Sequence, residues 1–266
     1  MEKPRTHLLA VALAACTLLL VITGAVVTTN EERPLYWLGQ YHTPIGIAVL
    51  AIAAVLAVAV RGTAQRKLVW GALAAIAAES ALGYWGDPMS PAVRVAHAML
   101  AQLLFATTVV LALVTSGDWQ GGPKHIESPA SLNVLARLTP ALVLLQVVLG
   151  ISFRHGVLGV LPHLSGGLII PIFIVVFAIP VLNRPGLAPV RPYGVAMLVV
   201  AGAQVFLGFT LFSMQQMDAD PTAMIVVTLA HATTAALTLS ATMLLAVQVL
   251  RAARPTMGTT VPVAGH

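Results

Sequence analysis

Residues 7–27 read HLLAVALAACTLLLVITGAVV, a stretch that contains no Asp, Glu, Lys or Arg and follows a short basic segment. An apolar helix of about 20 residues spans the hydrocarbon core of a bilayer. A secretory signal peptide starts in a similar way, but residues 26–29 read VVTT and offer no small-residue cleavage site. We therefore predict a transmembrane helix here. Its Cys16 is the single cysteine of the chain, which excludes an intrachain disulfide.

Seven further stretches of similar length and composition follow along the chain. The 266 residues are 58% hydrophobic and 9% charged, with a mean hydropathy of +0.91, whereas a soluble domain carries about 25% charged residues. Backbone groups cannot stay unpaired in lipid, so a helical bundle is the expected fold. We predict an all-α integral membrane protein with eight transmembrane helices. Their expected ranges are 7–27, 40–60, 67–85, 91–115, 133–153, 161–182, 192–213 and 223–251.

The basic residues predict how these helices are oriented. When the N-terminus is placed in the cytoplasm, only Arg33, Arg94 and Arg154 of the 14 Lys and Arg residues lie outside. The positive-inside rule then puts both termini in the cytoplasm of a multi-pass cell-membrane protein. The net charge of +5 reflects the inner segments and not nucleic-acid binding. The inner residues are Lys3, Arg5, Arg61, Arg66, Lys67, Lys124, Arg137, Arg184, Arg191, Arg251 and Arg254.

A short motif recurs near the outer ends of the odd-numbered helices. It reads Glu/Gln-x-x-Leu-Gly at residues 79–83, 146–150 and 204–208, with a degraded form at 20–24. Each copy is followed by an outer loop and then by a helix that carries a histidine, so one unit occurs four times. This repetition predicts two similar four-helix bundles, related by a pseudo-twofold axis along the membrane normal.

The repeat also sets the expected domain boundaries. The N-terminal bundle covers residues 1–115, and the C-terminal bundle covers residues 133–252. The polar segment 116–132 joins the two bundles on the cytoplasmic side. Residues 253–266 form a cytoplasmic tail.

Four histidines near the outer ends of the even-numbered helices are the strongest functional signal. They are His42, His97, His163 and His231. Each is followed four residues later by a small residue on the same helix face, which leaves room for a flat group beside the imidazole. These small residues are Gly46, Ala101, Gly167 and Ala235. Imidazole is a common axial ligand of haem iron, and facing helices of a bundle can hold a cofactor between them.

We expect His42 to pair with His97, and His163 with His231, each pair binding the iron of one haem. The alternative for a single helical histidine is an interfacial or hydrogen-bonded bundle residue. A non-haem metal is disfavoured because no carboxylate or cysteine joins the histidines at zinc or di-iron spacing.

Three charged residues lie near the expected haem sites. Arg154 stands just before His155 and the outer loop that leads to His163, where it could bind a haem carboxylate or snorkel at the interface. Arg94 has the same two interpretations. Glu79 is the only acidic residue within an apolar span. It is a candidate catalytic proton acceptor or relay, and the alternative is a protonated carboxyl that is hydrogen-bonded in the bundle.

The chain resembles the haem A synthase family over nearly its whole length. The resemblance lies in residues 23–28 (TGAVVT), in the Glu/Gln-x-x-Leu-Gly units before the histidine helices, and in residues 149–155 (LGISFRH). It implies that His163 and His231 hold a resident haem B. His42 and His97 would hold haem O, whose porphyrin methyl group is oxidised to formyl to give haem A for cytochrome oxidase assembly. The implied partners are membrane lipid, haem O synthase and cytochrome oxidase assembly factors.

The sequence also departs from that family. Gly39 stands where the family carries a glutamate before the first histidine, and Thr43 and Leu164 stand where an arginine commonly follows the ligand. The cysteine pair that many members have in the first outer loop is missing. A non-catalytic bis-histidine di-haem electron carrier or haem-handling subunit is therefore the alternative function. The electron acceptor and the oligomeric state, including a homo-oligomer, stay open.

Overall fold

The structure is a computed structural model, and it describes residues 3–28, 35–85, 90–121, 126–128, 130–217 and 219–255. The expected outer Arg33, the expected inner Lys124 and most of the expected tail lie outside these ranges.

The eight predicted membrane helices are confirmed, with ends that differ by a few residues. They are α1 (Lys3–Val27), α2 (His42–Ala59), α3 (Arg66–Trp85), α4 (Pro91–Thr115), α6 (Ala130–Arg154), α7 (Val160–Asn183), α8 (Arg191–Gln216) and α9 (Pro221–Ala252). All eight are long and apolar enough to cross a membrane. Pro91 and Pro221 begin α4 and α9, because proline lacks the N–H that a first helical turn leaves unpaired.

Short elements connect the long helices. They are η1 (Tyr36–Tyr41), α5 (Gly117–Gln120), η2 (Pro185–Val190) and the parallel pair of strands β1 (Ile126–Ser128) and β2 (Ala253–Pro255). The expected start of the second helix at residue 40 differs from the structure, because the tighter 3₁₀ turn of η1 leads directly into His42 as the first residue of α2.

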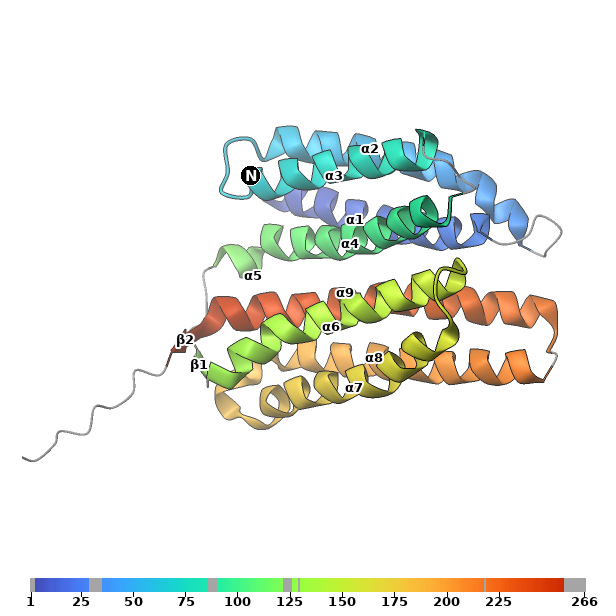
Figure 1. Cartoon of the computed structure of the whole chain (residues 1–266). Helices are drawn as coiled ribbons and strands as arrows, with labels where there is room; N and C mark the ends of the chain where they lie inside the picture. The colour runs from blue at the N-terminus through green and yellow to red at the C-terminus, as the bar shows by residue number, and fades with distance from the viewer. Residues whose placement is uncertain are drawn as a thin grey trace, which may run out of the picture.

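The long helices pack as two groups of four (Figure 1). Within α1–α4 and within α6–α9, consecutive helices touch and the first helix also packs on the last. The groups meet through α4 and α9, with further contacts of α1 with α9 and of α4 with α6. We call this contact between the two groups the seam. It is apolar at mid-depth, where Val21, Phe105 and Ala236 are buried together. The pseudo-twofold axis between the groups stays a prediction.

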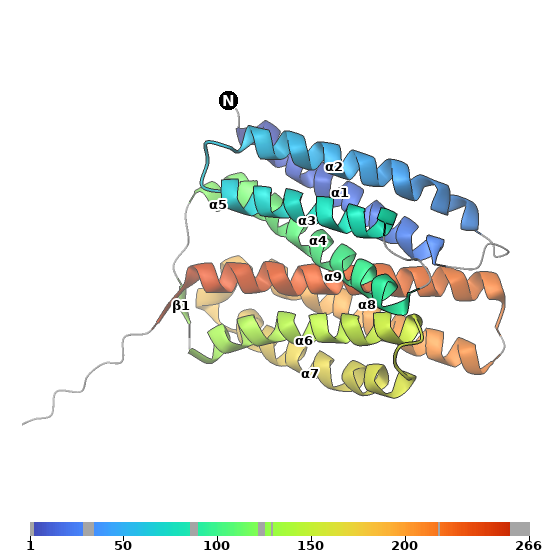
Figure 2. The ribbon, with the colours of Figure 1, turned by 45° about the horizontal axis from the view of Figure 1, so that its top comes forward.

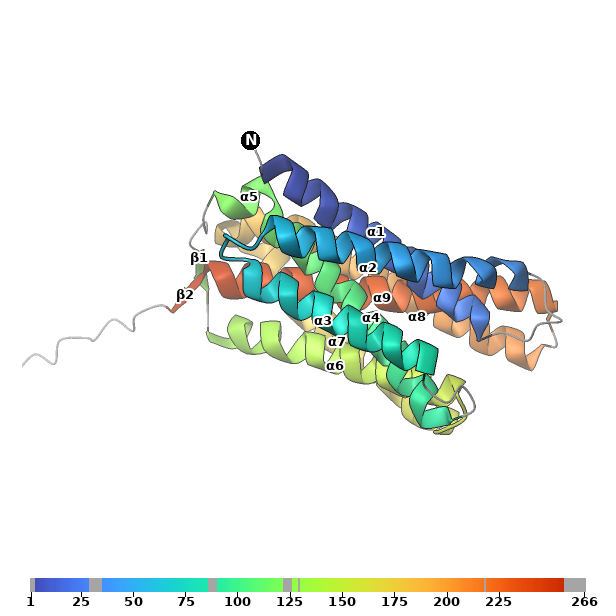
Figure 3. The same cartoon turned by 90° about the horizontal axis from the view of Figure 1, so that it is seen from above.

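The two ends of the molecule differ in what they contain. The first turn of α1 and the strand β2 lie at one end, and the first turns of α2, α4, α7 and α9 lie at the other (Figures 2 and 3). We call the latter the histidine end. At the opposite end, the Arg251 guanidinium lies 3.7 Å from the centre of the Trp119 ring and donates a 2.6 Å hydrogen bond to the Trp119 carbonyl. This contact ties α9 of the second group to α5.

The outer surface of the bundle suits lipid. Large apolar side chains such as Leu8, Ile47 and Phe206 are exposed. At the histidine end, Tyr84 and Trp85 are 80% and 78% exposed, as expected for aromatic residues that lie at a membrane–water interface. The chain is thus a multi-pass helical membrane protein.

Candidate functional site

The structure brings the four histidines together in the two expected pairs. The ring centres of His42 and His97 are 6.4 Å apart, and those of His163 and His231 are 6.2 Å apart. The ring planes are nearly perpendicular in both pairs, at 80° and 88°. All four side chains are half-buried. Both pairs lie at the histidine end, one in each group of four helices.

The last residue of each repeated motif is a glycine that packs directly against a histidine ring. A Cβ atom added at Gly24, Gly83, Gly150 or Gly208 would lie 2.9, 2.7, 2.8 or 3.1 Å from the Cε1 atom of the histidine on the next membrane helix. Only glycine allows an imidazole this close to the helix backbone. The repeated glycine therefore sets where each imidazole sits.

In the first half, groups that accept hydrogen bonds face the imidazole Nδ1 atoms. The Thr23 hydroxyl donates to the Leu19 carbonyl at 2.9 Å, so its oxygen accepts from His42 Nδ1 at 3.2 Å. Glu79 Oε1 lies 3.1 Å from His97 Nδ1, which is an ion-pair distance without the geometry of a hydrogen bond, and the glutamate is only 5% exposed. With Nδ1 carrying the proton, the Nε2 lone pair of each ring is free to bind a metal.

In the second half, side-chain amides lie beside the imidazoles in place of Thr23 and Glu79. Gln146 Nε2 donates to His163 Nδ1 at 3.1 Å and to the His163 carbonyl at 2.9 Å, while Gln146 Oε1 is buried without a hydrogen-bond partner. Gln204 Nε2 donates to His231 Nε2 at 3.2 Å, and its Oε1 accepts from the Thr234 hydroxyl. His231 Nδ1 is buried without a hydrogen-bond partner. The Phe153 ring stacks on His163 at 6.4 Å.

The small residues four positions after the histidines are half-buried on the same helix faces. They are Gly46, Ala101, Gly167 and Ala235. A Cβ atom at Gly46 would meet only Leu20 Cδ1, at 3.7 Å, and one at Gly167 would meet Gln146 Nε2 at 3.4 Å. The tight contacts of the imidazoles are therefore with the motif glycines, and space is left beside Gly46.

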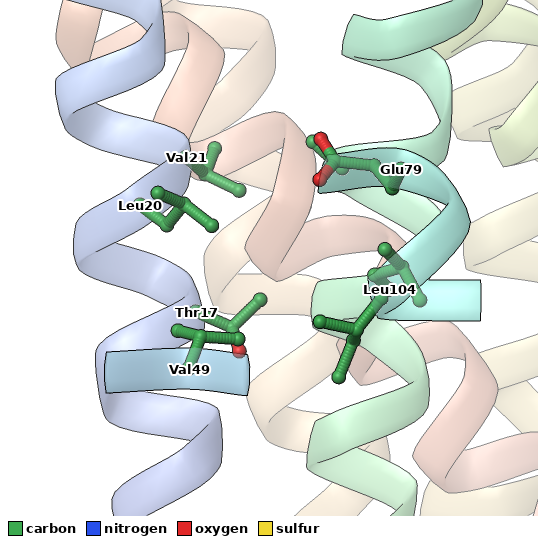
Figure 4. A pocket seen from close by; sticks show the side chains of 8 residues that line it. Thr17, Leu20, Val21, Val49, Glu79 and Leu104 are labelled. Carbon is green, nitrogen blue, oxygen red and sulfur yellow. The ribbon is translucent and has the colours of Figure 1, made fainter. Parts of the chain in front are cut away.

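A small cavity in the first half lies next to Glu79. Figure 4 shows the Glu79 side chain reaching from α3 toward Leu20 and Val21 of α1. The lining is otherwise apolar except for Thr17, whose hydroxyl donates to the Leu13 carbonyl at 2.7 Å. The other lining residues are Val49, Ile76, Ala101 and Leu104. The carboxyl group thus lies between His97 and an apolar space.

Arg94 and Arg154 lie at the seam between the groups of helices. Arg154 Nη2 donates to the Ala25 carbonyl at 2.8 Å and to Thr28 Oγ1 at 2.7 Å, both at the end of α1. A cation at this helix end is favoured by the helix dipole. Arg94 Nε is buried without a hydrogen-bond partner. Neither guanidinium is simply extended into solvent.

The spacing of each histidine pair fits two imidazoles on opposite sides of one metal ion. A five-membered ring with bonds of about 1.33 Å has its nitrogens about 1.1 Å from its centre, and a metal–imidazole bond is about 2.0–2.1 Å. Two rings that share a metal then have centres about 6.3 Å apart. The observed 6.4 and 6.2 Å match this separation. His42 with His97, and His163 with His231, would be the residues that hold one haem iron in each half.

The residues that hold the imidazoles were not predicted as such. Thr23, Gln146, Gln204 and the motif glycines belong to the recognised repeat, but their contact with the histidines was not expected. The four-residue spacing of the motif was the available signal, because it puts the polar residue and the glycine on one helix face. Among the described residues, no group of three or more His, Cys, Asp or Glu is arranged to hold a metal ion. No family model and no curated protein matches the chain.

Proposed function

We propose that the protein binds one haem between the histidines of each half and acts as a haem A synthase-like membrane oxidoreductase. The observation that supports haem binding is the 6.4 and 6.2 Å separation of the imidazole centres, which fits a shared iron ion. His163 and His231 would hold haem B. His42 and His97 would hold haem O, the substrate that becomes haem A.

The polar partners would fix which ring nitrogen faces the iron. Bound haem would supply the redox chemistry, while the chain's own residues hold the ligands and move protons. A metal-binding imidazole keeps the proton on its other nitrogen and donates it to an acceptor. Glu79 and Thr23 already offer acceptors in the first half. In the second half, the Gln146 amide would turn to present its unpartnered Oε1 to His163.

The difference between the halves supports oxidation in the first half. Conversion of a porphyrin methyl to a formyl group, with the oxygen taken from water, releases protons to the site and electrons to an external electron acceptor, so the reacting site needs a proton acceptor nearby. Glu79 is a buried carboxylate in that half, and amides stand at the equivalent positions 146 and 204. We assign Glu79 the role of proton acceptor.

A non-catalytic di-haem carrier is the second candidate function. Iron with two imidazole ligands is saturated and passes electrons without binding oxygen. The near-equal spacing of both pairs, 6.4 and 6.2 Å, favours this candidate because it gives both irons the same ligand set. Gly39, in place of the family's glutamate, favours it as well.

The proposed setting is the cell membrane, with the histidine end outside and both termini in the cytoplasm. The distribution of Lys and Arg supports this orientation. The proposed partners are haem O synthase and cytochrome oxidase assembly factors.

One experiment separates these functions. The protein is expressed with a source of haem O, purified, and its extracted porphyrins are identified by mass spectrometry. Haem A or its alcohol intermediate supports the synthase, and unchanged haem with a low-spin bis-histidine spectrum supports the carrier. A colourless protein without Soret absorbance after haem reconstitution rules out both. His7→Gln, at the opposite end of the bundle, is a matched control that should behave like the unaltered protein.

A further inference from the structure

Two arginines and a histidine from both halves gather at the histidine end of the seam. Arg94 is the fourth residue of α4, Arg154 is the last residue of α6, and His155 follows it; α4 and α6 are in contact. The pKa of His155 is lowered first by burial and then by the positive charges of Arg154 and Arg94, as expected for neighbouring cations. We call these three residues the seam cluster.

The seam cluster has positive charge that no described acid neutralises. Among the described residues, the one ion pair is that of Glu79 with His97. Arg154 uses Nη2 for Ala25 and Thr28, and hydrogen bonds from its Nε and Nη1 remain available. Arg94 Nε is buried and has no partner. Both arginines are half-buried, and a cation that is partly withdrawn from water without an acidic partner favours a bound anion.

The seam cluster is also aligned with both histidine pairs. Arg94 is three residues before His97 on the same face of α4, and therefore one turn closer to the histidine end. Arg154 is four residues after Gly150, the glycine that touches His163. One helical turn is about 5.4 Å along the axis. Arg94 thus lies one turn beyond His97 in the first half. Arg154 lies one turn beyond Gly150, the glycine that packs against His163, in the second half.

We propose that the seam cluster binds the carboxylate groups of the porphyrins held by the two halves. This inference rests on the proposed haem binding and adds to it a single anion site, built from both halves, at the porphyrin edge. The arginine fork matches a carboxylate with two parallel charge-assisted hydrogen bonds. Arg94 supplies this contact from the first half and Arg154 from the second.

The test compares haem with its dimethyl ester, which keeps the iron and the ring but lacks the negative charges. Both are titrated into haem-free protein in detergent, and Soret absorbance gives the affinities. We expect the ester to bind at least about tenfold more weakly, because it cannot accept charge-assisted hydrogen bonds from the arginines. Arg94→Gln should remove this preference from the first-half haem and leave that of the second-half haem. Arg137→Gln, an exposed arginine near the other end of α6, should retain it.

The possible outcomes separate this inference from the proposed function. If neither haem nor the ester binds, haem binding itself is wrong. If both bind equally well with a low-spin spectrum, haem binding stands and the seam cluster is not its carboxylate site. Repeating the titration in bilayer discs with and without anionic phosphatidylglycerol tests for a lipid phosphate. Loss of the preference only with the anionic lipid would assign the cluster to that headgroup and overturn the proposal.

Arg154 needs a separate control because it also joins the two halves. Thr28→Val removes one acceptor of Arg154 without changing any charge. If Thr28→Val keeps the preference for free haem and Arg154→Gln loses it, the charge of Arg154 is responsible. If both variants lose it equally, Arg154 acts by holding α1 and does not bind the carboxylate.

Discussion

The two halves of the molecule share one geometry but surround it with different chemistry. In both, a motif glycine seats each imidazole, and the ring centres end up 6.4 and 6.2 Å apart. Acceptors, Thr23 and Glu79, face the rings of the first half, whereas the amide nitrogens of Gln146 and Gln204 face those of the second. Backbone shape thus sets where the rings lie, and the polar partners set which protons they hold. If each half binds a haem as proposed, this difference would give the two haems different tasks.

The largest expected effect comes from removing a ligand in one half only. His163→Ala or His231→Ala should abolish one low-spin haem signal and leave the first-half haem in place, because each pair is proposed to bind its own iron. His42→Ala should do the reverse. Haem content by pyridine haemochrome assay, together with electron paramagnetic resonance, measures this. Unchanged haem content in either second-half variant would contradict the ligand assignment.

The next effect comes from the motif glycines. Gly83→Ala places a Cβ 2.7 Å from His97 Cε1, so the ring must move, at a cost of about 1–3 kcal/mol for overpacking. We expect about a tenfold or greater loss of first-half haem affinity. Gly208→Ala in the second half should cost less, since its Cβ would lie 3.1 Å from His231.

Gly71→Ala is the matched control for this series. It lies on α3 with Gly83, and a Cβ there meets nothing within 4 Å. Haem affinities from Soret titrations should therefore equal those of the unaltered protein. Equal affinities for Gly71→Ala and Gly83→Ala would show that the glycine contact does not position the ring.

Exchanging the polar partners tests the chemical difference between the halves. Glu79→Gln makes the first half resemble the second and should slow formation of haem A about 100-fold, the lower range for loss of a proton acceptor. Haem content should not change, because His42 and His97 remain. The reciprocal Gln146→Glu alters the second half and should not restore the rate of Glu79→Gln. An unaltered rate in Glu79→Gln would mean that Glu79 contributes to packing and does not accept protons.

The smallest effect concerns His155, at the seam between the halves. Burial and the charges of Arg154 and Arg94 lower its pKa below the ordinary 6.5. As the pH falls below 6.5, His155 binds a proton in the unfolded chain but stays neutral in the folded chain. The free energy of unfolding therefore declines until the pH reaches the lower pKa of the folded state. The half-exposed position limits this to less than about 1 kcal/mol.

Thermal unfolding in detergent between pH 8 and pH 5 measures the effect of His155. His155→Asn should lose less stability on acidification than the unaltered protein, and Arg137→Gln should follow the unaltered protein. A larger acid-induced loss in His155→Asn would mean that the sign is wrong.

The fold was predictable because membrane thickness fixes the length of apolar helices, as for residues 91–115, whose range agrees with α4. The pairing of His42 with His97 followed from the repeat. Contacts that depend on three-dimensional packing were not predictable. Helix periodicity does not reveal that Arg154 binds the end of α1, more than 120 residues earlier in the chain. The contact of Gln146 with His163 likewise depends on how two helices cross.

The incomplete burial of the imidazoles has a consequence for how a ligand could enter and leave the site. The His97 side chain keeps 29% of its surface accessible, and Ile47, on the same helix as His42, is 65% exposed. A planar hydrophobic molecule dissolved in the bilayer could therefore reach the imidazoles laterally, between two helices, and leave by the same route. With such lateral exchange, a poorly water-soluble ligand would not have to pass through the aqueous phase.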